Sequence, residues 1–133
     1  MPLKSDPKTW TDPRHVRGLY GEQVAIRYLG FAGWTVTDHR FRMGRLEIDV
    51  VARRKGTVAF VEVKTRWGAA FGQPIEAVTW SKRRDIARVA QAWIDRHGDP
   101  EYTYRFDVIG VTLSGTGPHR IRHVEDAFRV GWR

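Results

Sequence analysis

The chain has 133 residues, a formal net charge of +8 and a hydrophobic fraction of 41%, which is ordinary for a globular domain and excludes a disordered chain. It has no cysteine, so disulfides, thiol nucleophiles and cysteine-based zinc sites are excluded, and a cytoplasmic location is expected. No uncharged run approaches the roughly 18 apolar residues of a membrane span, so no membrane span is expected. The positive charge attracts polyanions, of which nucleic acid is the commonest and an anionic membrane the next, and charge alone does not decide between them; the expected partner is nucleic acid, with no membrane partner.

The amino-terminal part of the chain divides into a leader and a first helix. Residues 1–13 contain three of the six prolines among polar residues, which predicts a flexible leader before a single domain of residues 14–133. A helix is predicted from Pro13 to Leu29, because an Asp-Pro pair marks its start and a glycine follows its end. Glu22 falls on the apolar stripe of this helix, so a carboxylate should face the core.

The rest of the chain alternates between strand and helix patterns. Segments rich in valine, isoleucine, phenylalanine and threonine predict strands, and apolar residues at helical spacing predict one further long helix. The order αβββαββ indicates an α+β or α/β domain. The predicted strands are Trp34 to Phe41, Leu46 to Ala52, Thr57 to Lys64, Tyr104 to Leu113 and Arg120 to Glu125, and the second helix runs from Pro74 to about His97.

Charged residues interrupt the two predicted strands of a hairpin. Glu62 and Lys64 share one face because side chains alternate along a strand, and an even-numbered loop such as Arg53 to Gly56 would bring Asp49 to that face. Such charges are costly unless they pair, bind a cation or line an open cleft. Mg²⁺ prefers carboxylate, carbonyl and water oxygens, which Asp49, Glu62 and the Val63 carbonyl could supply. A salt bridge on the strand surface is the alternative.

Short motifs extend from about Gly18 to Phe128. They are Gly21-Glu22, Glu47-Ile48-Asp49, Phe60-Val61-Glu62-Val63-Lys64-Thr65-Arg66, Phe71-Gly72, Glu76-Ala77-Val78, Lys82, Arg105-Phe106-Asp107-Val108 and Ala127-Phe128. Together they resemble the YraN-like family of small bacterial proteins, which looks like a branch of the restriction-endonuclease-like PD-(D/E)xK superfamily, related to Holliday-junction resolvases. The resemblance implies an α/β fold with a restriction-endonuclease-like core, a central mixed sheet of about five strands flanked by helices.

The resemblance also implies roles for individual residues. Asp49 and Glu62 would be metal ligands, Lys64 a catalytic residue and Glu22 an accessory acid. The implied activity is that of an endonuclease that hydrolyses phosphodiester bonds in DNA with Mg²⁺ or Mn²⁺, with branched DNA in recombination or repair as one substrate. For Glu22 the alternative is a carboxylate hydrogen-bonded to the backbone or to Arg17.

Some residues depart from the family pattern or have a simpler explanation. Ile48 precedes Asp49 where the superfamily name expects proline. Leu46 precedes Glu47 where glycine is usual, which weakens any role for Glu47 beyond a solvated carboxylate. Asp107 shares a strand face with apolar residues, which predicts a structural charge paired with an arginine.

Three residues near the predicted site are candidates for nucleic acid contact. Lys82 projects from the apolar side of the second helix, where it could meet a phosphate. Arg66 and Trp67 begin a loop that could stack bases, although packing or a contact between two copies would also explain Trp67, and the other tryptophans are expected in the core. Cleavage of a four-way junction would call for a homodimer. A noncatalytic nucleic-acid-binding or scaffold protein that retains the nuclease fold is the alternative function.

Overall fold

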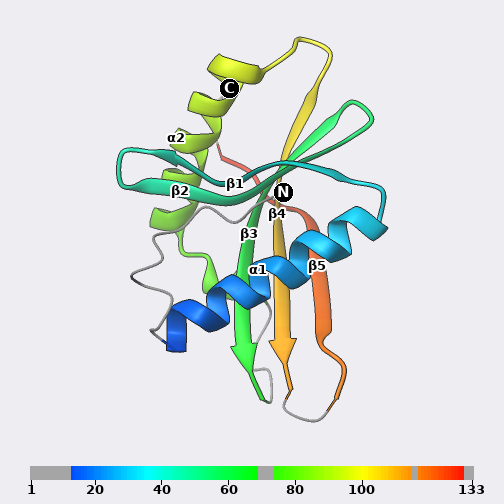
Figure 1. Cartoon of the computed structure of the whole chain (residues 1–133). Coiled ribbons are helices and arrows are strands. Elements are labelled where there is room, and N and C mark those ends of the chain that lie inside the picture. Colours follow the sequence, from blue (N-terminus) through cyan, green and yellow to red (C-terminus); the bar gives the residue numbers. More distant parts are fainter. Residues whose placement is uncertain (1–12, 69–73, 115–116, 131–133) are drawn as a thin grey trace.

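One mixed sheet between two long helices makes up the described part of the chain, residues 13–68, 74–114 and 117–130 of a computed structural model (Figure 1). Within these residues the strand order is β1-β2-β3-β4-β5, and the β3–β4 pair is parallel whereas the others are antiparallel. The predicted α/β fold is therefore confirmed. The elements are α1 (Pro13–Phe31), β1 (Thr35–Met43), β2 (Leu46–Arg54), β3 (Thr57–Trp67), the 3₁₀ turn η2 (Pro74–Ala77), α2 (Trp80–His97), β4 (Thr103–Leu113) and β5 (Arg120–Phe128).

Two predictions from the sequence concern the leader and membrane-spanning segments. The leader predicted for residues 1–13 lies outside the described residues except for Pro13, which begins α1. In the described ranges, neither α1 nor α2 has an apolar stretch long enough to cross a lipid bilayer.

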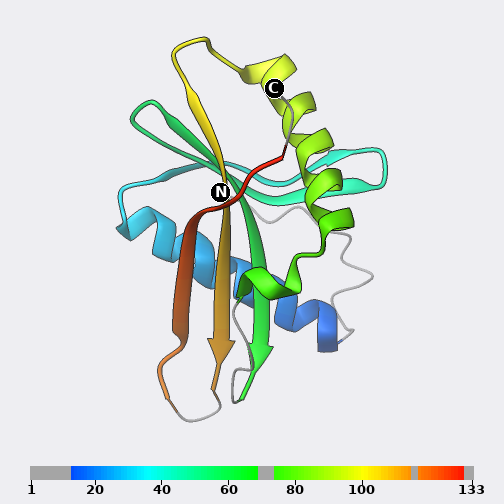
Figure 2. The same cartoon turned by 180° about the vertical axis from the view of Figure 1, so that it is seen from behind.

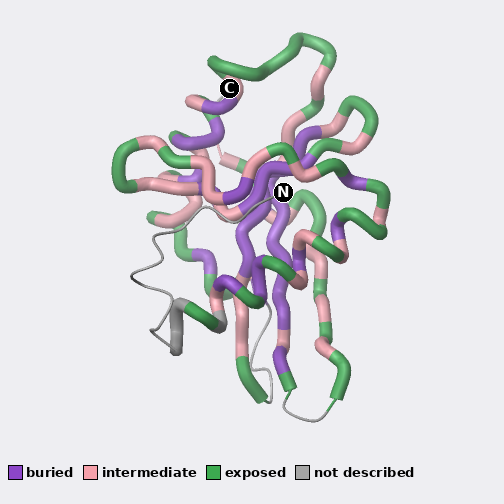
Figure 3. Tube along the Cα trace, in the orientation of Figure 1, coloured by how far each residue is buried: buried purple, intermediate pink, exposed green. Residues whose placement is uncertain are grey.

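The helices cover opposite faces of the sheet, as the views from the two sides show (Figures 1 and 2). Ala25 of α1 lies in one apolar core with Val61 of β3, whereas Trp93 of α2 packs edge-on against Phe60 in the other core. Phe60 and Val61 are consecutive, so strand alternation gives each core one of them. The buried residues accordingly concentrate along the central strands (Figure 3). A charged residue in β3 is therefore exceptional and needs a specific explanation.

The β2–β3 hairpin has an even-numbered turn, as the site prediction required. Arg54 pairs with Thr57, so the connection is the two-residue turn Lys55-Gly56 rather than the four-residue loop that was predicted. Lys55 adopts a left-handed φ of 56°, and this tight turn keeps two more residue pairs in the ladder. The pleat is unchanged by a shift of two residues, so the predicted facing of the charged residues is unaffected.

The second helix begins six residues later than predicted. Thr79 caps α2, since its side chain accepts a hydrogen bond of 3.1 Å from the backbone N–H of Lys82. The preceding Pro74–Ala77 turn is a separate element that packs on β4, where a Cβ on Gly110 would lie 3.0 Å from Cβ of Pro74. The helical pattern from Pro74 therefore covers two elements, and the cap at Thr79 separates them.

The tryptophans do not share one environment. Trp34 and Trp93 are buried at 4% exposure each, as predicted for core residues. Trp80 is 68% exposed at the start of α2, so the prediction of a core position was wrong for it. Its indole instead stacks on the Arg83 guanidinium, 4.5 Å from the ring centroid. Trp10 and Trp132 lie outside the described residues.

Candidate active site

The strand register brings Asp49 and Glu62 together at the point where β2 leaves β3. Val50 pairs with Val61 at the end of the ladder, so Asp49 and Glu62 are the next residues on the two strands. There the Oδ2 atom of Asp49 accepts a hydrogen bond of 2.8 Å from the backbone N–H of Val63. A carboxylate thus replaces a carbonyl as the acceptor, and the strands separate around the two acidic side chains.

The two carboxyl groups interact strongly. Burial, followed by the negative charges of Glu62 and Glu22, raises the pKa of Asp49 well above its ordinary value, and a hydrogen bond to Glu62 adds to the effect. When both groups are ionised neither can donate, and Oε1 of Glu62 is buried without a hydrogen-bond partner in the described chain. The pair therefore has oxygen lone pairs to offer a cation.

The other oxygen of Glu62 faces two ammonium groups. Nζ of Lys82 lies 3.5 Å and Nζ of Lys64 lies 3.8 Å from Oε2 of Glu62. Both distances exceed an ordinary N–H···O hydrogen bond of about 2.7 to 3.2 Å. The Glu62 side chain is 4% exposed, whereas the lysine side chains are 29% and 40% exposed. The lysines can therefore turn from Glu62 to a ligand without moving the strand.

A close contact between α1 and β3 brings Glu22 to the same region. A Cβ on Gly21 would lie 2.8 Å from Cβ of Thr65 and would overlap its hydroxyl, so only glycine allows the helix this near the strand. Glu22 follows directly and is buried. Its charge is one of the causes that raise the pKa of Asp49. Gly21 therefore places an acidic group within electrostatic reach of the carboxylate pair.

Glu22 is a hydrogen-bonded carboxylate, which was one of the two alternatives, but its partners come from β1. It accepts hydrogen bonds from Nε2 of His39 at 2.6 Å and from Nε and Nη2 of Arg40, both at 2.9 Å. Burial alone would raise the pKa of Glu22, but the hydrogen bonds from His39 and Arg40 outweigh burial and lower it. Glu22 therefore stays ionised beside Asp49.

Sequence patterns miss both partners of Glu22. His39 and Arg40 are consecutive in β1, and strand alternation would place them on opposite faces. Arg40 has a left-handed φ of 56°, which breaks the alternation so that both side chains reach one carboxylate. Neither hydrophobic periodicity nor turn residues in this segment signal that conformation.

The structure leaves other predicted residues apart from the acidic pair. Arg66 is half-buried and Trp67 is exposed, and among the described residues no hydrogen bond or ion pair joins either one to the acidic pair. Residues 69–73, which include Phe71 of the predicted loop, lie outside the described residues. Glu47 is bound by Arg42 at 2.9 Å on the surface. The site thus gathers the acidic pair, both lysines and Glu22.

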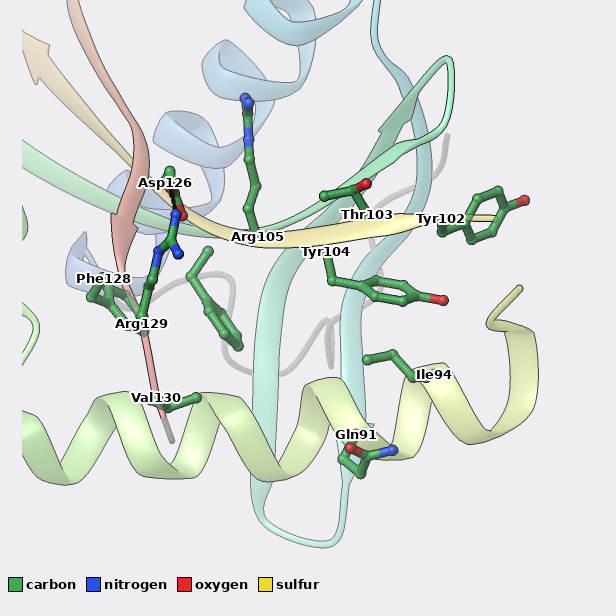
Figure 4. Close-up of a pocket in the computed structure, with 11 residues that line it drawn as sticks. Gln91, Ile94, Tyr102, Thr103, Tyr104, Arg105, Asp126, Phe128, Arg129 and Val130 are labelled. Atoms are coloured by element: carbon green, nitrogen blue, oxygen red, sulfur yellow. Dashed lines mark hydrogen bonds and ion pairs between the residues drawn. The ribbon is translucent and has the colours of Figure 1, made fainter. Parts of the chain in front are cut away.

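A cavity of about 560 Å³ lies elsewhere, between the second half of α2 and β4 (Figure 4). Aromatic and aliphatic side chains such as Tyr104, Phe128 and Ile94 line it. Its rim residues Asp126 and Arg129 bind each other at 2.9 Å. In the described chain no three histidine, cysteine, aspartate or glutamate side chains form a metal-binding cluster, here or elsewhere. A metal at the acidic pair would need the backbone and water as further ligands.

Comparisons with known proteins agree with the motifs. The family model described as "Uncharacterised protein family UPF0102" matches residues 21–111. A UPF0102 protein of Geobacter sulfurreducens is 40% identical over 117 residues, which cover 88% of this chain and 91% of the relative. UPF0102 proteins of Alkaliphilus oremlandii and Rhodococcus jostii are 42% and 43% identical, over 84% of this chain and 96% and 94% of their own. The chain therefore belongs to the UPF0102 family, the YraN-like family that its motifs resemble.

Proposed function

We propose that the protein is a metal-dependent nuclease that hydrolyses phosphodiester bonds in DNA. The observation that carries this proposal is the Asp49–Glu62 pair: the strand register places the two carboxyl groups side by side, and one buried oxygen of Glu62 has no hydrogen-bond donor in the described chain. Mg²⁺ is commonly held by one or two carboxylates and retained waters, so Asp49, Glu62 and the Val63 carbonyl fit it or Mn²⁺. When bound, the ion would acidify a water ligand and offset charge on phosphoryl oxygens.

The two lysines would act on opposite partners in this reaction. Lys64 shares a strand face with Glu62 and would orient the attacking water or take its proton. Lys82 reaches the same carboxylate from α2 and would hold a phosphate oxygen at the entrance. The net charge of +8 would attract a polyanionic substrate. Branched DNA is the finer proposal, and cutting a four-way junction would require two copies of the site, hence a homodimer.

A second candidate is a DNA-binding protein without catalytic activity. It is favoured by the same lysines, because Lys64 and Lys82 already place two positive charges beside Glu62. In that case the acidic pair would be neutralised within the protein, and added Mg²⁺ would neither bind nor stabilise the fold. The two candidates therefore differ in metal binding as well as in cleavage.

The test is cleavage of labelled linear, flapped and four-way DNA with Mg²⁺ or Mn²⁺. We expect Asp49→Ala, Glu62→Ala and Lys64→Ala each to lower the cleavage rate by about 100-fold or more, as for loss of a metal ligand or charged catalyst. Lys64→Ala should still bind DNA. Glu47→Ala is the matched control, since this carboxylate of the same strand is bound by Arg42 at the surface.

Thermal unfolding supplies a readout that does not depend on turnover. Mg²⁺ should raise the melting temperature of the wild type and leave that of Asp49→Ala unchanged. DNA binding without cleavage, together with no stabilisation by Mg²⁺, would instead identify the noncatalytic protein. Cleavage that persists unchanged in all three site variants would contradict the assignment of this site.

A further inference from the structure

Arg40 adopts a backbone conformation that is rare inside a strand. Three described non-glycine residues have a positive φ, namely Arg40, Lys55 and Asp126. Lys55 lies in the hairpin turn, and Asp126 lies where the β4–β5 register shifts. Arg40 instead lies inside β1, between residues that pair with Val50 and Ile48 of β2. Strained residues of this kind are concentrated at functional sites, so Arg40 needs an explanation.

This conformation fixes the guanidinium group beside the acidic pair. Arg40 is level with Asp49 in the β1–β2 ladder, and its side chain is only 11% exposed. Its Nε and Nη2 atoms each donate a hydrogen bond of 2.9 Å to the carboxylate of Glu22. This two-point contact holds the plane of the guanidinium in one orientation.

Part of the Arg40 guanidinium is still available to a ligand. A guanidinium has five N–H donors, and the two hydrogen bonds to Glu22 use only one from Nε and one from Nη2. No described residue accepts a hydrogen bond from Nη1. The hydrogen bond to Glu22, and then the charges of Glu22, Glu47 and Asp49, raise the pKa of Arg40. Its positive charge therefore lies near Asp49, whereas the two lysines lie near Glu62.

We propose that Arg40 binds a phosphate of the substrate, with the N–H groups of Nη1 donating to a nonbridging oxygen of the phosphodiester at Asp49. Glu22 is then a positioning residue that holds Arg40, rather than a metal ligand. The inference rests on the proposed function, since the phosphate is the one to be cleaved. The alternative is that Arg40 only neutralises the buried charge of Glu22. A guanidinium suits phosphate because its planar donors match the phosphate oxygens.

Two measurements, the cleavage rate and the salt dependence of DNA binding, separate these roles. The cleavage rate is compared for Arg40→Gln, Glu22→Gln and the double variant. If Arg40 binds phosphate, Arg40→Gln lowers cleavage by about 100-fold, and the double variant stays as slow. If Arg40 only neutralises Glu22, removal of both charges restores cleavage, which would overturn the proposal. Arg40→Gly is the second variant should the glutamine variant fail to fold, because glycine adopts a positive φ without strain.

The salt dependence of DNA binding in the absence of divalent metal is a readout that a structural role does not change. Loss of one phosphate contact in Arg40→Gln should reduce the slope of log K against log salt by about one. The slope of Glu22→Gln should fall less than that of Arg40→Gln, because this variant keeps the guanidinium. An unchanged slope in Arg40→Gln would contradict the inference. Absence of cleavage by the wild type would instead contradict the proposed function, and the salt slope would still test the phosphate contact.

Discussion

Two acidic clusters lie in neighbouring strands of the same sheet, and they are built in opposite ways. Asp107 in β4 is fully buried and accepts four hydrogen bonds: two from Arg105 at 3.0 and 3.1 Å, one from His123 at 2.7 Å and one from the backbone of Asp126 at 3.0 Å. Burial alone would raise the pKa of Asp107, but the hydrogen bonds, led by that from His123, lower it. Its negative charge is thus fully compensated.

The Asp49–Glu62 pair is compensated only in part, by the backbone N–H of Val63 and by two lysines beyond hydrogen-bond distance. The pKa of Asp49 is raised by burial and by Glu62, and one oxygen of Glu62 is buried without a donor in the described chain. Glu62 and Asp107 are both buried, so burial alone does not identify a functional carboxylate. The number of donors around each carboxylate oxygen separates the two clusters. A compensated carboxylate supports the fold, whereas a pair short of donors is suited to a cation from outside.

The largest expected effect is a loss of stability at the compensated cluster. Asp107→Ala removes the fully buried acceptor of His123, which is buried, and of Arg105, which is half-buried and among the described residues keeps only Glu125 at 3.4 Å, so the free energy of unfolding should fall by about 3 to 5 kcal/mol. Urea denaturation at neutral pH without divalent metal measures this. Glu62→Gln is the control, because its lysine partners are partly exposed and lie beyond hydrogen-bond distance, so that loss of this charge should change stability little. Similar losses in both variants would show that the two clusters do not differ in this respect.

The chemistry of both clusters was partly predictable from the sequence. Spacing along a strand places Glu62 and Lys64 on one face. Any turn with an even number of residues, whether two or four, adds Asp49 to that face. The prediction that Asp107 pairs with an arginine is confirmed by Arg105. These predictions succeed because they depend on local periodicity, which the backbone imposes on any strand.

The remaining contacts were not predictable, because they depend on a single dihedral angle or on distant segments. The positive φ of Arg40 has no signal in residue type and decides the partners of Glu22. The hydroxyl of Tyr28 forms a hydrogen bond with Nδ1 of His123, 95 residues away in the sequence. Trp80 was expected in the core as a large aromatic residue, but it follows the cap at Thr79 as the first residue of α2 and is exposed.

A smaller effect is expected from the helix that supports both clusters, since α1 carries Glu22 to one and Tyr28 to the other. Gly21→Ala would force a Cβ into the Thr65 side chain and should cost about 1 to 3 kcal/mol of stability. Gly18→Ala is the matched control, because a Cβ there meets no atom within 4 Å and favours the helix by up to about 1 kcal/mol. Urea denaturation compares them, and equal losses would contradict the role of the Gly21–Thr65 contact.

The smallest expected effect is on the pH dependence of stability, to which Asp107 and Asp49 contribute with opposite signs. The lowered pKa of Asp107 stabilises the fold above its ordinary value of 3.8, and this contribution is lost as the pH falls through the folded-state pKa. The pKa of Asp49 is raised, so its contribution is present below 3.8 and is lost as the pH rises through the folded-state pKa. Asp49→Asn should therefore gain stability relative to the wild type as the pH rises from about 4 to neutral.

Chemical denaturation across that pH range, without divalent metal, measures the difference in the free energy of unfolding between wild type and Asp49→Asn. Glu47→Gln is the control, because Arg42 binds this carboxylate at the surface. A difference that shrinks with rising pH would mean that ionised Asp49 is compensated within the protein, as Asp107 is. In that case added Mg²⁺ should stabilise neither the wild type nor Asp49→Asn. If the Asp49–Glu62 pair is instead short of donors, Mg²⁺ should restore the stability that the wild type loses at neutral pH and should leave Asp49→Asn unchanged.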